Sequence, residues 1–177
     1  MKIQFNNAFI ELDVDTVENL LKDIAAEIGD DGDEKYYELV KHEPRNWEES
    51  PLEGSLVEDV FHALEVESAH TCFLGQLMLF EEGARYVTKE MVEEIVKSDD
   101  IAMLGCFILG SKYMQHIEGI DETLEQLSQH REAEVRCAFA QNDEMSLQII
   151  RKLAKDSDVT VREAAIENLE LRYEVDE

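Results

Sequence analysis

The stretches EVRCAFAQN (residues 134–142) and TVREAAIEN (residues 160–168) carry nearly the same pattern, and this likeness decides the predicted fold. Equivalent residues, such as Arg136 and Arg162, lie 26 positions apart. A fixed displacement over many positions predicts one structural unit that is copied and stacked. Between the copies, apolar residues recur at helical spacing over residues 147–154, which predicts another helix. Each unit is therefore predicted to be a pair of helices.

At these residues the chain resembles the HEAT-like α-solenoids, and most closely the leucine-rich repeat variant family. That family shows a Val-Arg pair at the start of one helix, alternating small residues and an Asn at the helix end, as both stretches do. The resemblance implies an all-α, right-handed solenoid. Such repeats are general binding scaffolds, so the resemblance implies no particular activity.

The resemblance also implies that Arg136 and Arg162 brace neighbouring repeats. The family's structural Asp corresponds to Asp156, six residues before Arg162, whereas His130 stands at the equivalent place before Arg136. A buried Asp–Arg bond is therefore implied for Arg162, with no acid at that place for Arg136.

Capping residues and apolar stripes predict further helices upstream. The predicted segments are a helix that carries apolar residues from Val17 to Ile28 and is capped by Asp13 or Asp15, a helix starting at Leu56, residues 69–82 stopped at Gly83, a helix capped by Thr88, residues 101–117 opened by Asp99 or Asp100, and a helix opened by Asp121. Small-residue segments around Cys72, Cys106 and Cys137 are displaced by 34 and 31 positions, which predicts about four stacked helix pairs. Residues 55–177 are predicted to form these repeats, and residues 1–54 a divergent acidic N-terminal cap. Within the cap, residues 2–12 are predicted to form either a short hairpin or an extended arm packed on the first helix.

The charge of the chain is strongly negative. Its 177 residues include 42 acidic and 16 basic residues, for a formal net charge of −26. Such a field repels nucleic-acid phosphates and anionic membranes, and it speeds encounter with basic surfaces. We therefore expect neither direct nucleic-acid binding nor membrane binding. Three cysteines without CxxC spacing and an amino terminus without a long apolar core favour a cytoplasmic location.

Motifs that carry chemistry are missing from the sequence. It contains no GxSxG, SxxK, GxGxxG or GxxxxGK[ST] pattern, so we expect neither an enzyme nor a bound cofactor. His62, His70 and Cys72 lack the spacing of a zinc site, and the cysteines are expected to be small buried residues between helices. The acidic turn around Gly32 resembles a calcium loop, but Gly29 stands where a third-position oxygen ligand is needed. We expect no metal site.

Negative charge is densest in residues 1–70, which hold 19 acidic and 5 basic residues. The only tryptophan, Trp47, lies there in a segment predicted to be an irregular loop. It either anchors a partner or folds back and covers the end of the first helices. The predicted partner-binding residues are Asp30, Asp31, Asp33, Glu34, Trp47, Glu48, Glu49 and Glu53. An ordinary solvated surface would have the same composition.

These features favour a non-catalytic protein that binds a partner with a basic surface. The most concrete version is an inhibitor that covers the nucleic-acid-binding surface of an enzyme, as a nucleic-acid mimic of the anti-defence type. An immunity protein against a basic toxin would use the same physics. A scaffold or assembly module that holds a peptide or subunit on its concave face is the other class, and it predicts an exposed apolar strip along the inner helices.

Overall fold

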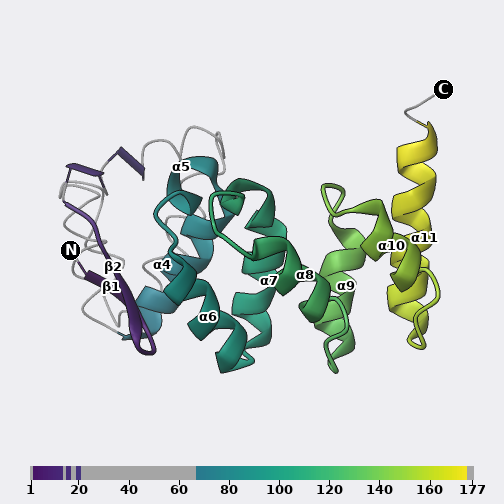
Figure 1. Cartoon of the computed structure of the whole chain (residues 1–177), viewed down its shortest axis with the longest axis horizontal. Helices are drawn as coiled ribbons and strands as arrows, with labels where there is room; N and C mark the ends of the chain where they lie inside the picture. Colours follow the sequence, from purple (N-terminus) through teal and green to yellow (C-terminus); the bar gives the residue numbers. More distant parts are fainter. Residues whose placement is uncertain (1, 14, 17–18, 21–66, 175–177) are drawn as a thin grey trace, which may run out of the picture. The chain divides into compact units, whose positions relative to one another are not determined.

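The structure, a computed structural model, describes residues 2–13, 15–16, 19–20 and 67–174 of the chain. This part contains eight α-helices, one 3-10 helix and one two-stranded hairpin (Figure 1). The predicted predominance of helices is therefore confirmed. The chain forms two compact units, residues 1–94 and 95–177. The helix predicted to start at Leu56 and the predicted boundary after residue 54 lie outside the described residues.

The first unit begins with a hairpin of strands β1 (Lys2–Phe5) and β2 (Ala8–Glu11), which pair antiparallel with Lys2 opposite Glu11. The two-residue turn places Asn6 at a φ of 51°, a left-handed conformation that Asn tolerates better than most residues. Alternate side chains of both strands are buried, and β1 packs against helix α4 (Glu67–Leu79). Of the two alternatives for residues 2–12, the hairpin is correct.

Asp13, rather than Asp15, caps the short helical turn that follows. Its carboxylate accepts hydrogen bonds of 2.8 Å from both the backbone N–H and the hydroxyl of Thr16. These bonds hold the pKa of Asp13 below its usual value. Leu20 of this segment is 1% exposed, so the described part of the predicted helix contributes to the core.

Helix α4 and the short helix α5 (Glu81–Ala84) correct one prediction. Gly83 does not stop a helix, because α4 already ends at Leu79 and Phe80 has an extended backbone before α5 begins. A Cβ added to Gly83 would lie 2.4 Å from the carbonyl oxygen of Leu77. The glycine is therefore needed for the close packing of α5 on α4. Helix α6 (Lys89–Ser98) starts as predicted, with the Thr88 hydroxyl accepting from the N–H of Met91 at 3.3 Å.

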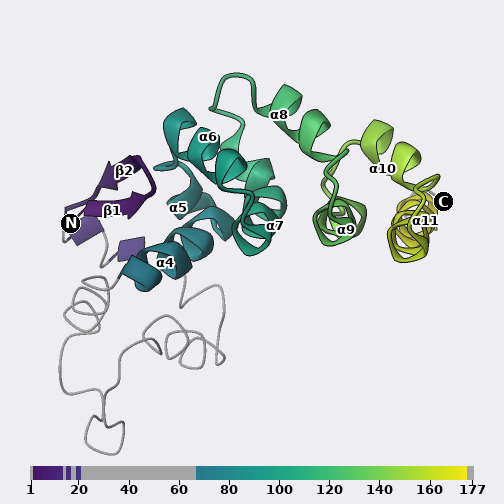
Figure 2. The ribbon, with the colours of Figure 1, turned by 90° about the horizontal axis from the view of Figure 1, so that it is seen from below.

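The second unit contains α7 (Ile101–Gly110), the 3-10 helix η3 (Ser111–Met114), α8 (Ile120–Leu127), α9 (Ala133–Gln141), α10 (Leu147–Leu153) and α11 (Val159–Glu174). Helix α9 packs against both α7 and α11, and α10 packs against α9 and α11 (Figure 2). The core between them includes Leu104, Phe107, Phe139, Ile150 and Ala165, none of which is exposed.

Three helix boundaries in this unit differ from the predictions. The helix predicted over residues 101–117 ends at Gly110, where the backbone N–H of Ser111 donates to the carbonyl of Ile108, three residues back, and the chain continues as the 3-10 helix η3. Helix α8 is preceded by Gly119 in a left-handed conformation, and Asp121 lies in its first turn instead of capping it. The repeated Asn marks a helix end only once: Asn142 follows α9, whereas Asn168 lies inside α11. Asp100 is the residue that caps α7, accepting from the N–H of Met103 at 3.0 Å.

Candidate functional site

The eight predicted partner-binding residues, Asp30, Asp31, Asp33, Glu34, Trp47, Glu48, Glu49 and Glu53, lie outside the described residues. Residues 21–66 hold 14 acidic and 4 basic residues. The side chains that the structure does describe offer three arrangements for function: a polar cluster at the helix corners, a network of Arg, Asp and Asn between helices, and a cavity beside α11.

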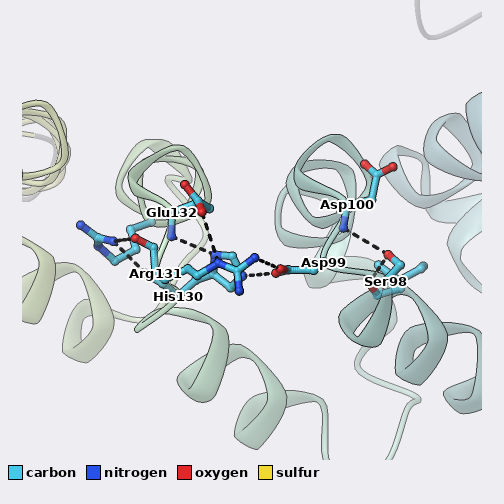
Figure 3. Close-up of polar contacts among 8 residues, drawn as sticks. Ser98, Asp99, Asp100, His130, Arg131 and Glu132 are labelled. Atoms are coloured by element: carbon cyan, nitrogen blue, oxygen red, sulfur yellow. Dashed lines mark hydrogen bonds and ion pairs between the residues drawn. The ribbon is translucent and has the colours of Figure 1, made fainter.

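The polar cluster joins the turn after α6 to the turn after α8 (Figure 3). Asp99, at a φ of 59°, directs one carboxylate oxygen to Nε2 of His130 at 2.6 Å, and its other oxygen accepts from the Arg131 guanidinium. The imidazole is 13% exposed. Sequence reasoning considered Asp99 only as a helix cap, because nothing in the local pattern indicates a partner 31 residues away.

Both ring nitrogens of the histidine in this cluster contact other described residues. The backbone N–H of Glu132 donates to Nδ1 of His130 at 3.2 Å, so Nδ1 carries no proton and Nε2–H is the donor to Asp99. The Asp–His pair therefore joins the two turns.

Arg136 of α9 forms a buried bidentate pair with Asp156, in the turn before α11. Its Nε and Nη2 donate to the two carboxylate oxygens at 2.8 and 2.9 Å, and the side chains are 14% and 10% exposed. The resemblance implied this bond for Arg162, and that assignment is wrong. Arg162 donates instead to the backbone carbonyls of Asp156 and Ser157.

The two repeated arginines nevertheless play equivalent structural roles. Nη1 of Arg136 donates to the carbonyls five and six residues before it, at 2.9 and 2.7 Å. Nη1 of Arg162 does the same at 2.8 and 2.7 Å. Each arginine closes the turn that precedes its own helix. Arg136 also pairs with a carboxylate, that of Asp156, which belongs to the following copy of the repeat. The spacing within one copy does not predict this pairing.

The Asp156 carboxylate should make the protein sensitive to acid. Its hydrogen bonds from Arg136 hold its pKa below the usual value. The stability that it contributes is complete above the unfolded-state pKa of about 4, and it is lost as the pH falls through the lower folded-state pKa. We expect Asp156→Asn to make the free energy of unfolding less dependent on pH below about pH 4. Urea unfolding between neutral pH and pH 3 measures this, and an unchanged slope would contradict it.

Buried asparagines link neighbouring helices. Nδ2 of Asn142 donates to the carbonyl of Ile108 on α7 at 2.9 Å, and Nδ2 of Asn168 donates to the carbonyl of Ala140 on α9, also at 2.9 Å. Oδ1 of Asn142 accepts from the N–H of Glu144 at 2.9 Å. Both asparagines are less than 8% exposed.

Replacing Asn142 with alanine should therefore destabilise the second unit. The change leaves the Ile108 carbonyl and the Glu144 N–H each without this partner, and we expect a loss of roughly 2 to 3 kcal/mol in the free energy of unfolding. Asn142→Asp keeps the acceptor for Glu144 but removes the donor, and it should recover none of the bond to α7. Thermal unfolding of the two variants tests this; wild-type stability in Asn142→Ala would refute it.

The third arrangement is a cavity of about 180 Å³ between the end of α9, the loop after it and α11. Asp143, Glu167, Asn168, Leu171 and Arg172 are among its lining residues. In the described part of the chain, only two buried side-chain atoms lack a hydrogen-bond partner, and both belong to this lining: Oδ1 of Asn168 and Nε of Arg172. Sequence reasoning missed this cavity because its walls come from two copies of the repeat.

Exposed carboxylates are frequent in residues 95–174. Residues 95–174 hold 16 acidic and 9 basic residues. Several exposed acids have no ion pair with another described residue: Glu118, Asp121, Glu122, Glu134, Asp143, Glu163, Glu167 and Glu170. Glu163, Glu167 and Glu170 lie three or four residues apart on α11, so they share one face of that helix.

The described residues offer little for metal or nucleophilic chemistry. Among them, no group of three His, Cys, Asp or Glu side chains is placed to hold a metal ion. The side chains of His62, His70 and Cys72 lie outside the described part. Cys106 and Cys137 are in no disulfide bond and are half-buried, so they are more accessible than the predicted buried cysteines. Burial raises the pKa of the Cys137 thiol, which keeps it protonated at neutral pH.

Comparison of the chain with protein-family models, with curated proteins and with solved structures gives no match in any of the three. In the ranges that the structure covers, no helix has the length and apolar character that a membrane crossing requires.

Proposed function

We propose that this protein is a non-catalytic binding protein whose partner has a basic surface. The observation that carries the proposal is the row of exposed carboxylates on α11, Glu163, Glu167 and Glu170, which have no cationic partner among the described residues. Exposed acids on one face of a helix repel one another, and a cationic partner would relieve that repulsion. The net charge of −26 extends the same preference over the whole chain.

The scaffold that we propose for this surface is a right-handed, HEAT-like α-solenoid. Three observations support it: the 26-residue spacing of Arg136 and Arg162, their equivalent bonds to the preceding turns, and the packing of α9 against both α7 and α11. A stack of this kind presents an extended surface that suits another macromolecule better than a small substrate. The proposal includes a cytoplasmic location, which is supported by an odd number of cysteines without the spacing of a disulfide framework.

In its most concrete form, the protein inhibits an enzyme by covering its nucleic-acid-binding surface. Carboxylates at helical spacing carry the same sign of charge as a phosphate backbone, so they compete for the same lysines and arginines. An immunity protein bound to a basic toxin would use the same contacts. The two versions name different partners, but both depend on attraction between carboxylates and a basic surface.

Affinity capture from a lysate with the full chain as bait tests the proposal. The expected result is a basic protein that is retained at low ionic strength, is released by about 1 M salt, where the screening length falls to about 3 Å, and is displaced by added DNA or RNA. A triple variant, Glu163→Gln, Glu167→Gln and Glu170→Gln, should retain less of it. Capture that is indifferent to salt and to nucleic acid would overturn the proposal.

One observation favours a second candidate, a scaffold that holds a subunit through apolar contacts. Val159 and Ile166 of α11 are 53% and 44% exposed, and Ile166 corresponds in the repeat to Ala140, which is fully buried on α9. An additional helix packed on α11 would cover this position. The same capture experiment separates the candidates, because an apolar interface would survive high salt and be weakened by Ile166→Ser.

A further inference from the structure

One face of α11 lacks the helix that covers the equivalent faces of α7 and α9. Nδ2 of Asn142 donates to the carbonyl of Ile108 on α7, and Nδ2 of Asn168 donates to the carbonyl of Ala140 on α9. Ile108 and Ala140 are therefore equivalent, and both are fully buried where the next helix packs. The third equivalent residue, Ile166, is 44% exposed, because no described helix of the second unit follows α11 in the row formed by α7, α9 and α11 (Figure 2).

The exposed residues of this face form a stripe along the helix, which we call the α11 stripe. It consists of Val159, Glu163, Ile166 and Glu170, at spacings of four, three and four residues, so they share one side of α11. All four are exposed, and the two carboxylates have no ion pair with another described residue. At about 1.5 Å per residue, the stripe is about 17 Å long, which is sufficient to contact three turns of another helix.

The charge of the α11 stripe restricts what can cover it. Three residues before Ile108 and Ala140, the helices α7 and α9 carry the uncharged residues Gly105 and Cys137, which are half-buried. Glu163 stands at the same place on α11. A helix that packed there without a cation would bury part of an unpaired carboxylate, which is costly. The covering helix must therefore place a lysine or arginine opposite this glutamate.

A second copy of the chain does not fit this face. In a symmetric dimer the same surface meets itself, so Glu163 and Glu170 would lie against the same glutamates of the other copy. Two chains with a formal net charge of −26 also repel one another. A row of helices that ended in water would be polar on its outer face, whereas Val159 and Ile166 are apolar.

We propose that the α11 stripe binds an amphipathic helix of the basic partner, a step that rests on the proposed function. Apolar side chains of that helix pack on Val159 and Ile166, and lysine or arginine side chains between them pair with Glu163 and Glu170. The partner segment is thus recognised by apolar and basic residues that alternate at three-and-four spacing. The apolar contacts fix the register, and the ion pairs make the affinity depend on salt.

The test uses nuclear magnetic resonance of the full chain with two peptides of about 16 residues, long enough to form an isolated helix. In the first peptide, leucine and lysine alternate at four-and-three spacing on one face of an alanine and glutamine background. The second peptide has the same composition, with the leucines and lysines distributed around the helix. Backbone amide resonances of α11 should shift saturably with the first peptide, and the second should bind at least about fivefold more weakly, because its leucines cannot contact Val159 and Ile166 together. Equal binding of the two peptides, or shifts centred on another helix, would overturn the proposal.

Two double variants with the same change in charge locate the acidic contacts. Glu163→Gln with Glu170→Gln should weaken binding of the first peptide by about fivefold or more, because two ion pairs are lost. Asp121→Asn with Glu122→Gln, in the first turn of α8, should change it by less than about twofold, since salt screens charges that the peptide does not contact. Equal weakening by both pairs would show that only the general negative field attracts the peptide, and would overturn the proposal.

The apolar contacts have a matched comparison of their own. Ile166→Ser should weaken binding of the first peptide by about fivefold or more, because a leucine of the peptide loses its apolar contact. Leu147→Ser, at the start of α10, removes an apolar side chain that is similarly exposed on another helix, and it should leave binding unchanged. Thermal unfolding of the variants checks that they are folded. Wild-type affinity in folded Ile166→Ser would contradict the proposal.

Failure of this inference can be told apart from failure of the proposed function. If Ile166→Ser captures a basic protein from the lysate as well as the wild-type chain does, with the same salt dependence, the assignment to the α11 stripe is wrong while the proposed function stands. If the wild-type chain captures no salt-sensitive partner, the proposed function fails, and this inference fails with it.

Discussion

Asp156→Ala is expected to lower the free energy of unfolding of the second unit by about 3 to 5 kcal/mol, the usual cost of breaking a buried ion pair by removing one partner. The change leaves the guanidinium of Arg136, only 14% exposed, without its two charge-assisted bonds. It also removes the carboxylate that accepts from the backbone N–H of Asp158 at 2.8 Å and shapes the turn before α11. Urea unfolding followed by circular dichroism measures the loss.

A smaller loss, of about 1 to 3 kcal/mol, is expected for Arg162→Ala, which removes hydrogen bonds to two carbonyls and no ion pair. Combining Asp156→Ala with Arg136→Ala should cost less than the sum of the two single changes, because the second change no longer leaves a buried charge unpaired. If Asp156→Ala proved no more harmful than Arg162→Ala, the pairing with Arg136 would not be the main brace between α9 and α11.

Phe139→Ala is expected to cost about 3 to 5 kcal/mol. Phe139 is completely buried on α9, the helix that packs against both α7 and α11. Removing the ring leaves a cavity in the core of the second unit, which the neighbouring helices fill only partially. The expected signature is a lower thermal midpoint together with faster amide hydrogen exchange in both α7 and α11.

Ile166→Ala provides the matched comparison for this prediction. It also shortens an apolar side chain on a helix of the second unit, but Ile166 is 44% exposed. Its effect should stay within about 0.5 kcal/mol, as for most surface substitutions. Similar losses for the two variants would mean that the core is not centred on α9.

Local signals in the sequence predicted much of the fold because they act over a few residues. The hydroxyl of Thr88, the carboxylate of Asp100 and the hairpin around Asn6 each form short-range hydrogen bonds or backbone conformations that neighbouring residues determine. The prediction around Gly83 was wrong for the opposite reason. Its role depends on contact with the backbone of Leu77, which packing brings close.

The candidate site was harder to predict. The residues chosen from charge density and from the single tryptophan lie in residues 21–66, which the structure leaves undescribed. The cavity beside α11 was not predicted, since its carboxylates, Asp143 and Glu167, come from different copies of the repeat. Asn142 follows the end of its helix, whereas Asn168 lies inside α11, and only the first arrangement provides a donor for Oδ1. The sequence does not predict this difference, because the two stretches carry nearly the same pattern.

The sequence by itself determined that the chain is mainly helical, that its last third repeats at 26 residues, and that its formal net charge is −26. These properties follow from spacing and composition, which the order of residues states directly. Only the tertiary structure decided that Asp156 pairs with Arg136, that both nitrogens of His130 are engaged, and that a buried acceptor and donor remain unused beside α11. Each of these depends on which side chains of different helices lie next to one another. Packing decides this, and the periodicity along one helix does not predict it.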